Sequence, residues 1–393
     1  MPMPEARFRL APRMAEIQPF YVMELLGRAK ALEAAGRDIV HMEVGEPDFP
    51  TPEPVLEAVR EALEHGRMFY TPALGMPELR AAIAGFYRDR YGVEVAPERI
   101  LVTPGASGAL QLATAVLLAP GEALLMADPG YPCNRHFARL VEARAVGVPV
   151  GPESGYQLTA AQVEAHWTAE TAAVLVASPS NPTGTVVERA EMAAIAAAVH
   201  RRGGRLLVDE IYNGLVYEGD VTTALAITDE AFVINSFSKY FGMTGWRIGW
   251  LVAPPAYVRD LEKLAQNLFI SAPTPSQYAA LAALRPETLA IAEERRLAFR
   301  ERRDYLLPAL RELGFRIPVT PQGAFYLYAD ISAFSDDSHR FAMDLLERAG
   351  VAVTPGLDFG ANAPGRHVRF AYTTSLPRLE EAVARIRAYL EGP

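Results

Sequence analysis

The sequence predicts an α/β protein built on a mostly parallel, seven-stranded sheet with helices on both faces, joined to a smaller α+β domain. Between residues 98 and 252, short apolar runs alternate with helical patterns, as in open parallel sheets. These runs are apolar throughout, which indicates strands that are buried on both faces. Beyond residue 275 the order changes, because a long helical pattern precedes two strands and two further helices.

The expected elements follow in chain order. The strands of the large sheet are predicted at 100–103, 123–127, 143–148, 173–177, 205–208, 232–235 and 248–252. Helices between them are predicted at 107–118, 132–141, 160–167 and 188–202. The remainder is expected to form a helix from about 275 to 313, strands at 325–330 and 368–372, and helices at 339–349 and 376–390. We therefore expect a large domain at 46–285 and a small domain formed by 1–45 and 286–393.

Length and composition limit the classes of protein. A chain of 393 residues exceeds the usual size of one compact core, which favours two domains. Half of the residues are apolar and 22% are charged, as in ordinary globular proteins. The net charge of −9 argues against nucleic acid as a partner. No apolar run reaches the roughly 18 residues needed to span a membrane, so no membrane partner is expected.

The chain has one cysteine, Cys133, which excludes an intrachain disulfide and a multi-cysteine metal site. A single thiol also suits a reducing compartment. The first ten residues mix prolines and charges and lack the apolar core of a signal peptide. We expect a cytoplasmic protein without a metal.

Lysine is rare in this chain and occurs at Lys30, Lys239 and Lys263. Of these, Lys239 alone lies in an apolar and aromatic segment, N-S-F-S-K-Y-F-G. Its stem could simply pack on Phe237 and Tyr240. Alternatively, it could react with a carbonyl group of a ligand. The local sequence leaves both interpretations open.

Polar and small residues follow the predicted strands, where ligands of open α/β sheets bind. After 100–103 come Pro104, Gly105, Ala106 and Ser107, small residues that could open a helix and bind an anion there. A plain turn would look the same. The segment has neither the G-x-x-x-x-G-K-[ST] pattern of a P-loop nor the G-x-G-x-x-G pattern of dinucleotide sites.

The other strand ends carry groups with distinct chemistry. They supply the phenols of Tyr131 and Tyr212, the amide of Asn181, the carboxylate of Asp209 and the amine of Lys239. Arg247 is expected to enter the strand that follows Lys239. Each has a plain structural alternative, such as the turn chemistry of S-P-S-N-P-T-G. Together they would suit one ligand, a pyridine ring that bears a phosphate, an aldehyde and a hydroxyl.

Several motifs resemble those of class I/II aminotransferases, enzymes of the pyridoxal-phosphate fold type I, and in particular the bacterial aspartate aminotransferases. The lysine segment S-F-S-K-Y-F-G-M-T-G-W-R-I-G is accompanied by V-G-E-P-D-F-P-T-P, Y-T-P-A-L-G, S-P-S-N-P-T-G, D-E-I-Y and V-R-F-A-Y, in the family's order and approximate spacing. The resemblance covers nearly the whole chain. It implies pyridoxal 5′-phosphate as the cofactor. It also favours a Lys239 that reacts with a ligand carbonyl over one that only packs on its neighbours.

The resemblance also implies roles for individual residues. Lys239 would hold the cofactor as an aldimine and later move the substrate's Cα proton, Asp209 would pair with the ring nitrogen, and Tyr212 and Asn181 would contact its phenolic oxygen. Tyr131 would stack on the ring. The phosphate would be held by Gly105, Ala106, Ser107, Ser236 and Arg247.

For substrate and assembly the resemblance implies further contacts. Arg369, with Gly45 and Asn181, would bind the substrate's α-carboxylate, although a surface-strand arginine is the plainer alternative. Tyr70 would reach the phosphate of a partner subunit, which implies a homodimer with composite active sites, and Asn267 would face the same pocket.

The predicted function is amino transfer from an L-amino acid to a 2-oxo acid through a pyridoxamine phosphate intermediate, in amino acid metabolism. Ser107 stands where the bacterial aspartate enzymes have a lysine that is thought to pair with the distal carboxylate, which favours uncharged or aromatic donors. The alternative activity is a pyridoxal-phosphate-dependent carbon–sulfur β-lyase. A transcription regulator would carry a basic helix-turn-helix pattern before Gly45, and the sequence shows none there. A catalytically dead binding protein would be expected to lack Lys239 or Asp209, and both are present.

Overall fold

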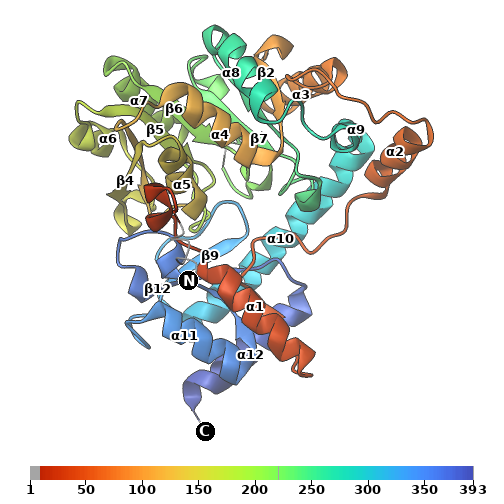
Figure 1. Ribbon diagram of the computed structural model, residues 1–393. Helices are drawn as coiled ribbons and strands as arrows, with labels where there is room; N and C mark the ends of the chain where they lie inside the picture. Colours follow the sequence, from red (N-terminus) through yellow and green to blue (C-terminus); the bar gives the residue numbers. More distant parts are fainter. Residues whose placement is uncertain (1–8, 220, 393) are drawn as a thin grey trace, which may run out of the picture.

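The computed structural model describes residues 9–219 and 221–392 and places them in two units, a large one above a smaller one in Figure 1. Residues 1–8 lie outside these ranges, and they make up most of the segment that was compared with a signal peptide. Pro393 of the expected small domain also lies outside them. Within them, no helix is both long and apolar enough to cross a bilayer.

The large unit is built around a seven-stranded sheet with the order β2-β8-β7-β6-β5-β3-β4. Strand β8 runs antiparallel to both of its neighbours, and the other pairings are parallel. All strands except β8 therefore end at the same edge. The strands are β2 (Ile100–Thr103), β3 (Ala123–Asp128), β4 (Arg144–Pro149), β5 (Thr171–Ala177), β6 (Arg205–Asp209), β7 (Phe232–Ser236) and β8 (Gly249–Val252). The predicted strands and the predicted fold class are confirmed.

Helices cover both faces of this sheet, as the continuous apolar strands predict. Neighbouring residues of a strand point to opposite faces: in β5, Leu175 packs with α4 and α8, whereas Val174 belongs to the cluster that includes α3 and α7. The helices of the unit are α2 (Glu53–Glu64), α3 (Pro77–Tyr91), α4 (Gly105–Leu117), α5 (Pro132–Leu140), α6 (Ala160–His166), α7 (Arg189–Arg201), α8 (Pro255–Leu268) and α9 (Thr274–Ala283).

The small unit combines helices with a three-stranded antiparallel sheet of order β11-β12-β9. The N-terminal segment joins it, because β1 pairs with β10 in parallel and the N–H of Ala371 donates to the carbonyl of Met42 at 2.8 Å. The elements are α1 (Tyr21–Ala34), β1 (Val40–His41), α10 (Pro286–Glu312), β9 (Tyr326–Asp330), α11 (Ser338–Asp344), β10 (Val351–Ala352), β11 (Thr354–Pro355), β12 (His367–Ala371) and α12 (Leu376–Glu391). The exact domain boundaries stay a prediction.

The helix expected from about 275 to 313 is wrong as a single element. The chain forms α9 and α10 instead, and Arg285 between them is extended with ψ of 149°. The cause is Pro286, because a proline ring disfavours helical geometry in the preceding residue. A smaller difference occurs at 339–349, where α11 ends at Asp344 and a π-helical turn, Leu345–Ala349, follows.

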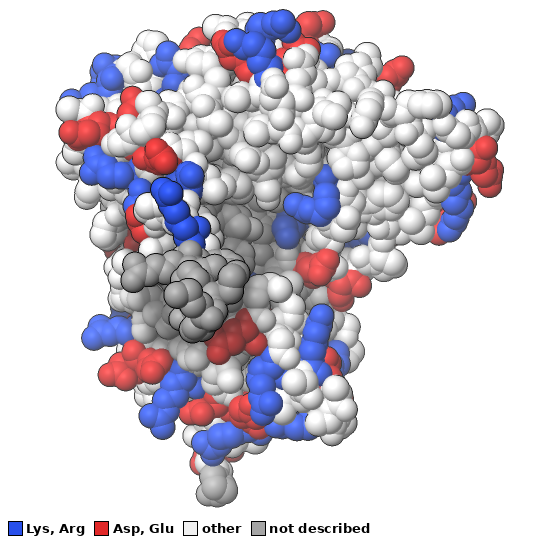
Figure 2. Space-filling view, viewed as in Figure 1, with Lys and Arg blue, Asp and Glu red and all other residues white. Residues whose placement is uncertain are grey.

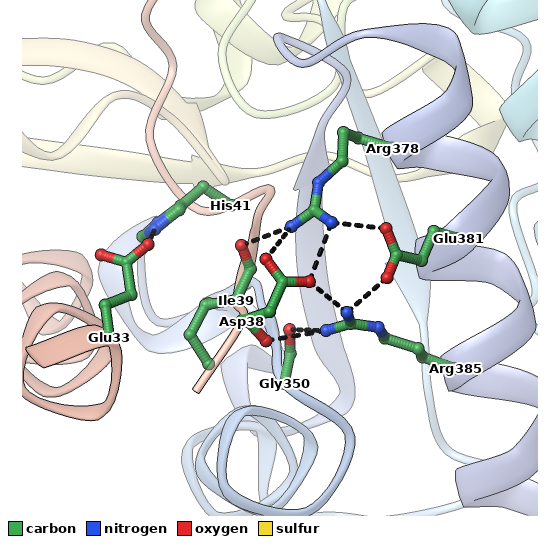
Figure 3. Close-up of polar contacts among 8 residues, drawn as sticks. All are labelled: Glu33, Asp38, Ile39, His41, Gly350, Arg378, Glu381 and Arg385. Atoms are coloured by element: carbon green, nitrogen blue, oxygen red, sulfur yellow. Dashed lines mark hydrogen bonds and ion pairs between the residues drawn. The ribbon is translucent and has the colours of Figure 1, made fainter. Parts of the chain in front are cut away.

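An ion-pair network ties the N-terminal segment to α12 (Figure 3). Both Nη atoms of Arg378 lie 2.9 Å from the two carboxylate oxygens of Asp38. Arg385 also contacts Asp38, and Glu381 pairs with both arginines. Arg378 further donates to the carbonyl of Ile39 at 2.9 Å. The arginines lower the pKa of Asp38 from its ordinary value of 3.8 to about 2.

We expect Asp38→Asn to lower the melting temperature near neutral pH. A carboxyl whose pKa is lower in the folded than in the unfolded state stabilises the fold above its unfolded pKa, and this contribution disappears as the pH falls through the folded pKa. The difference between variant and wild type should therefore be full at pH 6 and shrink from about pH 4 toward pH 2, as measured by thermal unfolding. Asp89→Asn is the control, because Asp89 pairs with the adjacent Arg88 on the surface. A pH-independent difference for Asp38→Asn would contradict the network's role.

Candidate active site

A cavity of ≈ 250 Å³ lies at the edge where the parallel strands end, and the surface in Figure 2 is hollowed between the two units. Each unit supplies part of its wall. The large unit contributes residues that follow strand ends, among them Ala106, Ser107, Tyr131, Asn181, Asp209, Tyr212, Ser238, Lys239 and Arg247. The small unit and the N-terminal segment contribute Phe20, Val22, Met23, Gly45, Tyr326, Thr354, Asp358, Phe359 and Arg369.

Most of the residues singled out in the sequence come together here. Gly105 and Ser236 lie just behind the lining, since Gly105 faces Arg247 and the hydroxyl of Ser236 donates to that of Ser238 at 2.9 Å. Tyr70 does not join the cavity of its own chain and is 81% exposed. Asn267 is also away from it, on α8.

Lys239 follows β7, and its Nζ donates to the carbonyl of Gly45 at 2.7 Å. This contact joins the large unit to the segment that leads out of the small one. Burial lowers the pKa of Lys239 from 10.5 to about 8, because a charged ammonium loses hydration in apolar surroundings. About a tenth of the amine is thus uncharged at pH 7, and this form can act as a nucleophile or a base.

Asp209 is the last residue of β6 and is buried. Its Oδ1 accepts the N–H of Ile211 at 3.1 Å, and burial raises the pKa of its carboxyl to about 6. No ion pair to Asp209 is formed within residues 9–219 and 221–392. A buried carboxylate without a cation is costly, so a protonated nitrogen of a ligand would suit this position.

Arg369 lies in β12, with 5% of its surface exposed. Its Nη1 donates to Oδ1 of Asn181 at 2.9 Å and its Nη2 to Oγ1 of Thr354 at 3.1 Å. Its Nε is buried and, within the described chain, has no hydrogen-bond partner. The guanidinium sits 4.3 Å from the ring centre of Tyr326. All these partners are uncharged, which leaves the cation suited to a carboxylate from outside the chain.

Two phenols meet beside Arg369. The hydroxyls of Tyr212 and Tyr326 are 2.7 Å apart, and both rings are buried. Burial raises the pKa of Tyr212 well above its ordinary value of 10, so the phenol stays protonated and can donate a hydrogen bond at neutral pH.

The N-terminus of α4 forms an anion cradle with Arg247. The helix has no side-chain cap and no acidic residue in its first turn, so its free N–H groups and its dipole favour a negative group. Gly105 has a φ of 71°, and a Cβ there would lie 2.7 Å from Nη2 of Arg247. The expectation that Arg247 enters a strand is wrong: it adopts a left-handed conformation after the turn Thr244–Trp246, and β8 begins only at Gly249. This turn directs the guanidinium to the helix end.

The sequence interpretation missed several residues of this wall, among them Ser238, Tyr326, Asp358, Phe359 and the apolar group Phe20, Val22 and Met23. Ser238 stands next to Lys239 in the lysine motif, so its hydroxyl could have been considered there. Tyr326, Asp358 and Phe359 carry no local signal, because they reach the cavity from the small unit only after the chain has folded.

A pyridoxal phosphate group fits these donors. The cradle at α4 accepts a phosphate, Asp209 accepts a ring N–H, Lys239 offers an amine of lowered pKa, and Tyr131 borders the space between them. The orphaned Nε of Arg369 leaves one further cationic donor for a substrate carboxylate.

The chain is similar to known aminotransferases. Residues 37–386 match the family "Aminotransferase class I and II". The valine–pyruvate aminotransferase of Mycobacterium tuberculosis is 40% identical over 96% of this chain and 97% of that protein. The aspartate/prephenate aminotransferase of Thermus thermophilus is 37% identical over 97% of this chain and 98% of that protein. The crystal structure of an aminotransferase from Mycobacterium tuberculosis superposes with a TM-score of 0.95 at 40% identity, covering 98% of this chain and 99% of that one.

Gly105→Ala is expected to weaken anion binding at α4 about tenfold or more, because the methyl group displaces the Arg247 guanidinium and a charge-assisted contact is lost. Inorganic phosphate is the probe, with its dissociation constant measured by calorimetry on the apoprotein. Gly121→Ala is the matched control, since Gly121 has a φ of 85° and nothing within 4 Å of its Cβ position. Both variants should lose about 1 kcal/mol of stability from the left-handed backbone. Equal phosphate affinity in the two variants would contradict the cradle.

Proposed function

The chain belongs to the aminotransferase class I and II family, and from that premise we propose which of its residues carry the reaction and which substrates it takes. The protein is a pyridoxal-phosphate-dependent aminotransferase that transfers an amino group between an amino acid and a 2-oxo acid, and no finding favours the lyase alternative. The proposal rests on one observation: a single cavity is lined by Lys239, Asp209 and Arg369, none of which forms an ion pair within the described chain.

Pyridoxal phosphate supplies, when bound, an electron sink for cleavage of the bond between the substrate's Cα and its hydrogen. We assign its phosphate to Gly105, Ala106, Ser107, Ser236 and Arg247, with Ser238 added from its place in the lining. Asp209 keeps the ring nitrogen protonated, Tyr131 stacks on the ring, and Asn181 and Tyr212 contact its phenolic oxygen.

We assign the proton transfers to Lys239. With a pKa near 8, its amine anchors the cofactor at rest and takes the substrate's Cα proton once released from it. The carbonyl of Gly45 accepts from Nζ and holds the amine in the cavity. Bases act best when their pKa lies near the working pH, and burial brings Lys239 into that range.

Arg369 binds the substrate's α-carboxylate in this proposal. A planar guanidinium can form two parallel hydrogen bonds to a carboxylate, and its Nε has no other partner among the described residues. Asn181 and the backbone of Gly45 assist. The rings of Tyr326 and Phe359 at 4.3 and 5.0 Å keep water away from the pair.

We propose a neutral, apolar side chain on the amino donor. Among the described lining residues the basic side chains are Lys239, Arg247 and Arg369, and each already has a task. The lining also includes Glu43, a fully buried acidic residue that adds no cation for a distal carboxylate. Another part of the wall is apolar, formed by Phe20, Val22 and Met23. The relative named for valine and pyruvate supports this class.

Valine should react with the holoenzyme with a kcat/KM at least about tenfold above that of aspartate, which is the usual size of selection by one mismatched group in a pocket. The half-reaction is followed from the absorbance change of the bound cofactor after mixing with each amino acid alone. Faster reaction with aspartate would contradict the donor class.

Lys239→Ala tests the chemistry: it should lose the cofactor's visible absorbance and nearly all turnover, and retained absorbance would refute the assignment of Lys239.

We also propose a homodimer with composite active sites, and a cytoplasmic location that the single Cys133 supports. The proposed contact is an apolar surface formed by Leu63, Phe69, Tyr70, Leu268 and Ile270. The exposed fraction of each of these residues lies between 49% and 81%. Leu63 lies on α2, Phe69 and Tyr70 follow that helix, Leu268 ends α8 and Ile270 precedes α9. Figure 2 shows a largely uncharged surface around α9. In the proposed dimer this apolar surface is covered, and Tyr70 reaches the phosphate in the partner's cavity.

Sedimentation equilibrium should give about twice the chain mass of 42.9 kDa. Phe69→Asp should raise the dimer dissociation constant about 30-fold or more, the effect of losing one interface hot spot. Leu140→Asp is the matched control, because Leu140 is 45% exposed and lies on α5, outside the apolar surface. A monomeric wild type would overturn the dimer, and equal effects of the two variants would overturn the interface.

A further inference from the structure

Helix α1 begins without a cap of its own. Its N-cap residue is Phe20, whose side chain has no acceptor, and the structure shows no cap from a neighbouring side chain in sequence. Instead the carboxylate of Asp358 accepts the N–H of Tyr21 at 2.8 Å and that of Val22 at 2.9 Å. These are free N–H groups of the first helical turn, where an acceptor with a negative charge stabilises most. The cap is thus supplied from more than three hundred residues away.

The turn that carries Asp358 touches the rest of the site. Its neighbour Phe359 lies 5.0 Å from the Arg369 guanidinium, and the carbonyl of Phe359 accepts the N–H of Gly130 at 2.8 Å, one residue before Tyr131. The carbonyl of Asp358 accepts Nη2 of Arg135 on α5 at 2.8 Å. Residues 358 and 359 therefore join α1 to the carboxylate-binding arginine and to the large unit.

The part of α1 that Asp358 holds is also the part that lines the cavity. Phe20, Val22 and Met23 form its apolar wall, and the N–H of Val22 is one of the two capped groups. The carboxylate itself is buried, at 5% exposure. Loss of the cap would free the first turn of α1 while leaving Lys239, Asp209 and Arg369 on their own strands and loops.

We infer that Asp358 is a positioning residue for substrate selection: by capping α1 it holds Phe20, Val22 and Met23 against the donor's side chain. The inference rests on the proposed function for the identity of the donor but not for the cap. Removal of the carboxylate should weaken binding of a branched apolar donor, whose side chain reaches the wall, more than binding of alanine.

The test compares Asp358→Ala with Asp358→Asn in the holoenzyme. Asp358→Ala should raise KM for valine about tenfold, in line with the strength of a charged N-cap, with kcat changed less than about twofold and a smaller KM effect for alanine. Hydrogen exchange of the amides of Tyr21 and Val22 should accelerate. Asp358→Asn keeps one of the two acceptor oxygens, so it should slow the exchange of one of these amides and bring the KM for valine part of the way back to the wild-type value.

Asp337→Ala is the matched control, because the side chain of Asp337 caps α11 by accepting the N–H of Arg340 at 3.0 Å, and it is not among the residues that line the cavity. It should leave KM unchanged. An unchanged KM for valine in Asp358→Ala, an equal loss in kcat, or the same KM effect in Asp337→Ala would overturn the inference. If the wild type reacts with no neutral amino acid, the donor proposal fails, while slow exchange at Tyr21 and Val22 that Asp358→Ala accelerates would still support the cap.

Discussion

Arg369 carries a positive charge inside the protein, and its hydrogen-bond partners in the described chain are all uncharged. Burying a cation in this way is costly unless every donor is satisfied. The side chains of Asn181 and Thr354, and the carbonyl of Glu43, satisfy part of the guanidinium, and Nε stays free. These partners come from the large unit, from β11 and from the N-terminal segment, so the two units must meet for the arginine to be held. The free Nε of Arg369 can then donate a hydrogen bond to an incoming carboxylate.

The same physical cause acts in opposite directions on the other charged groups. Burial disfavours charge, so it lowers the pKa of Lys239 to about 8 and raises that of Asp209 to about 6. Each shift suits its proposed task, since the lysine needs a neutral amine and the aspartate must still be ionised at neutral pH. The sheet brings both groups to one edge, because β6 and β7 run parallel and end side by side. Chemistry and phosphate binding thus depend on the large unit.

Selection of the donor depends on a different part of the molecule. The apolar wall at Phe20–Met23 begins a helix that has no cap in its own sequence, and Asp358 provides one from the small unit. Because Phe359 packs on Arg369, the wall and the carboxylate site share one short turn. A change of substrate class can therefore arise in the small unit without disturbing the groups that handle the cofactor.

The amino-acid sequence by itself determined the parallel sheet, the order of its strands along the chain and the groups at their ends. Apolar runs and the residues that follow them are local signals, and Lys239, Asp209 and Asn181 could be found from them. Other features needed only a stricter local rule, such as the helix break before Pro286. Tyr326 and Asp358 could not be found in this way, because they reach the cavity from strands and turns far away in sequence. The left-handed turn at Arg247 and the cap on α1 were likewise decided by the tertiary structure, since contacts between distant segments leave no pattern along the chain.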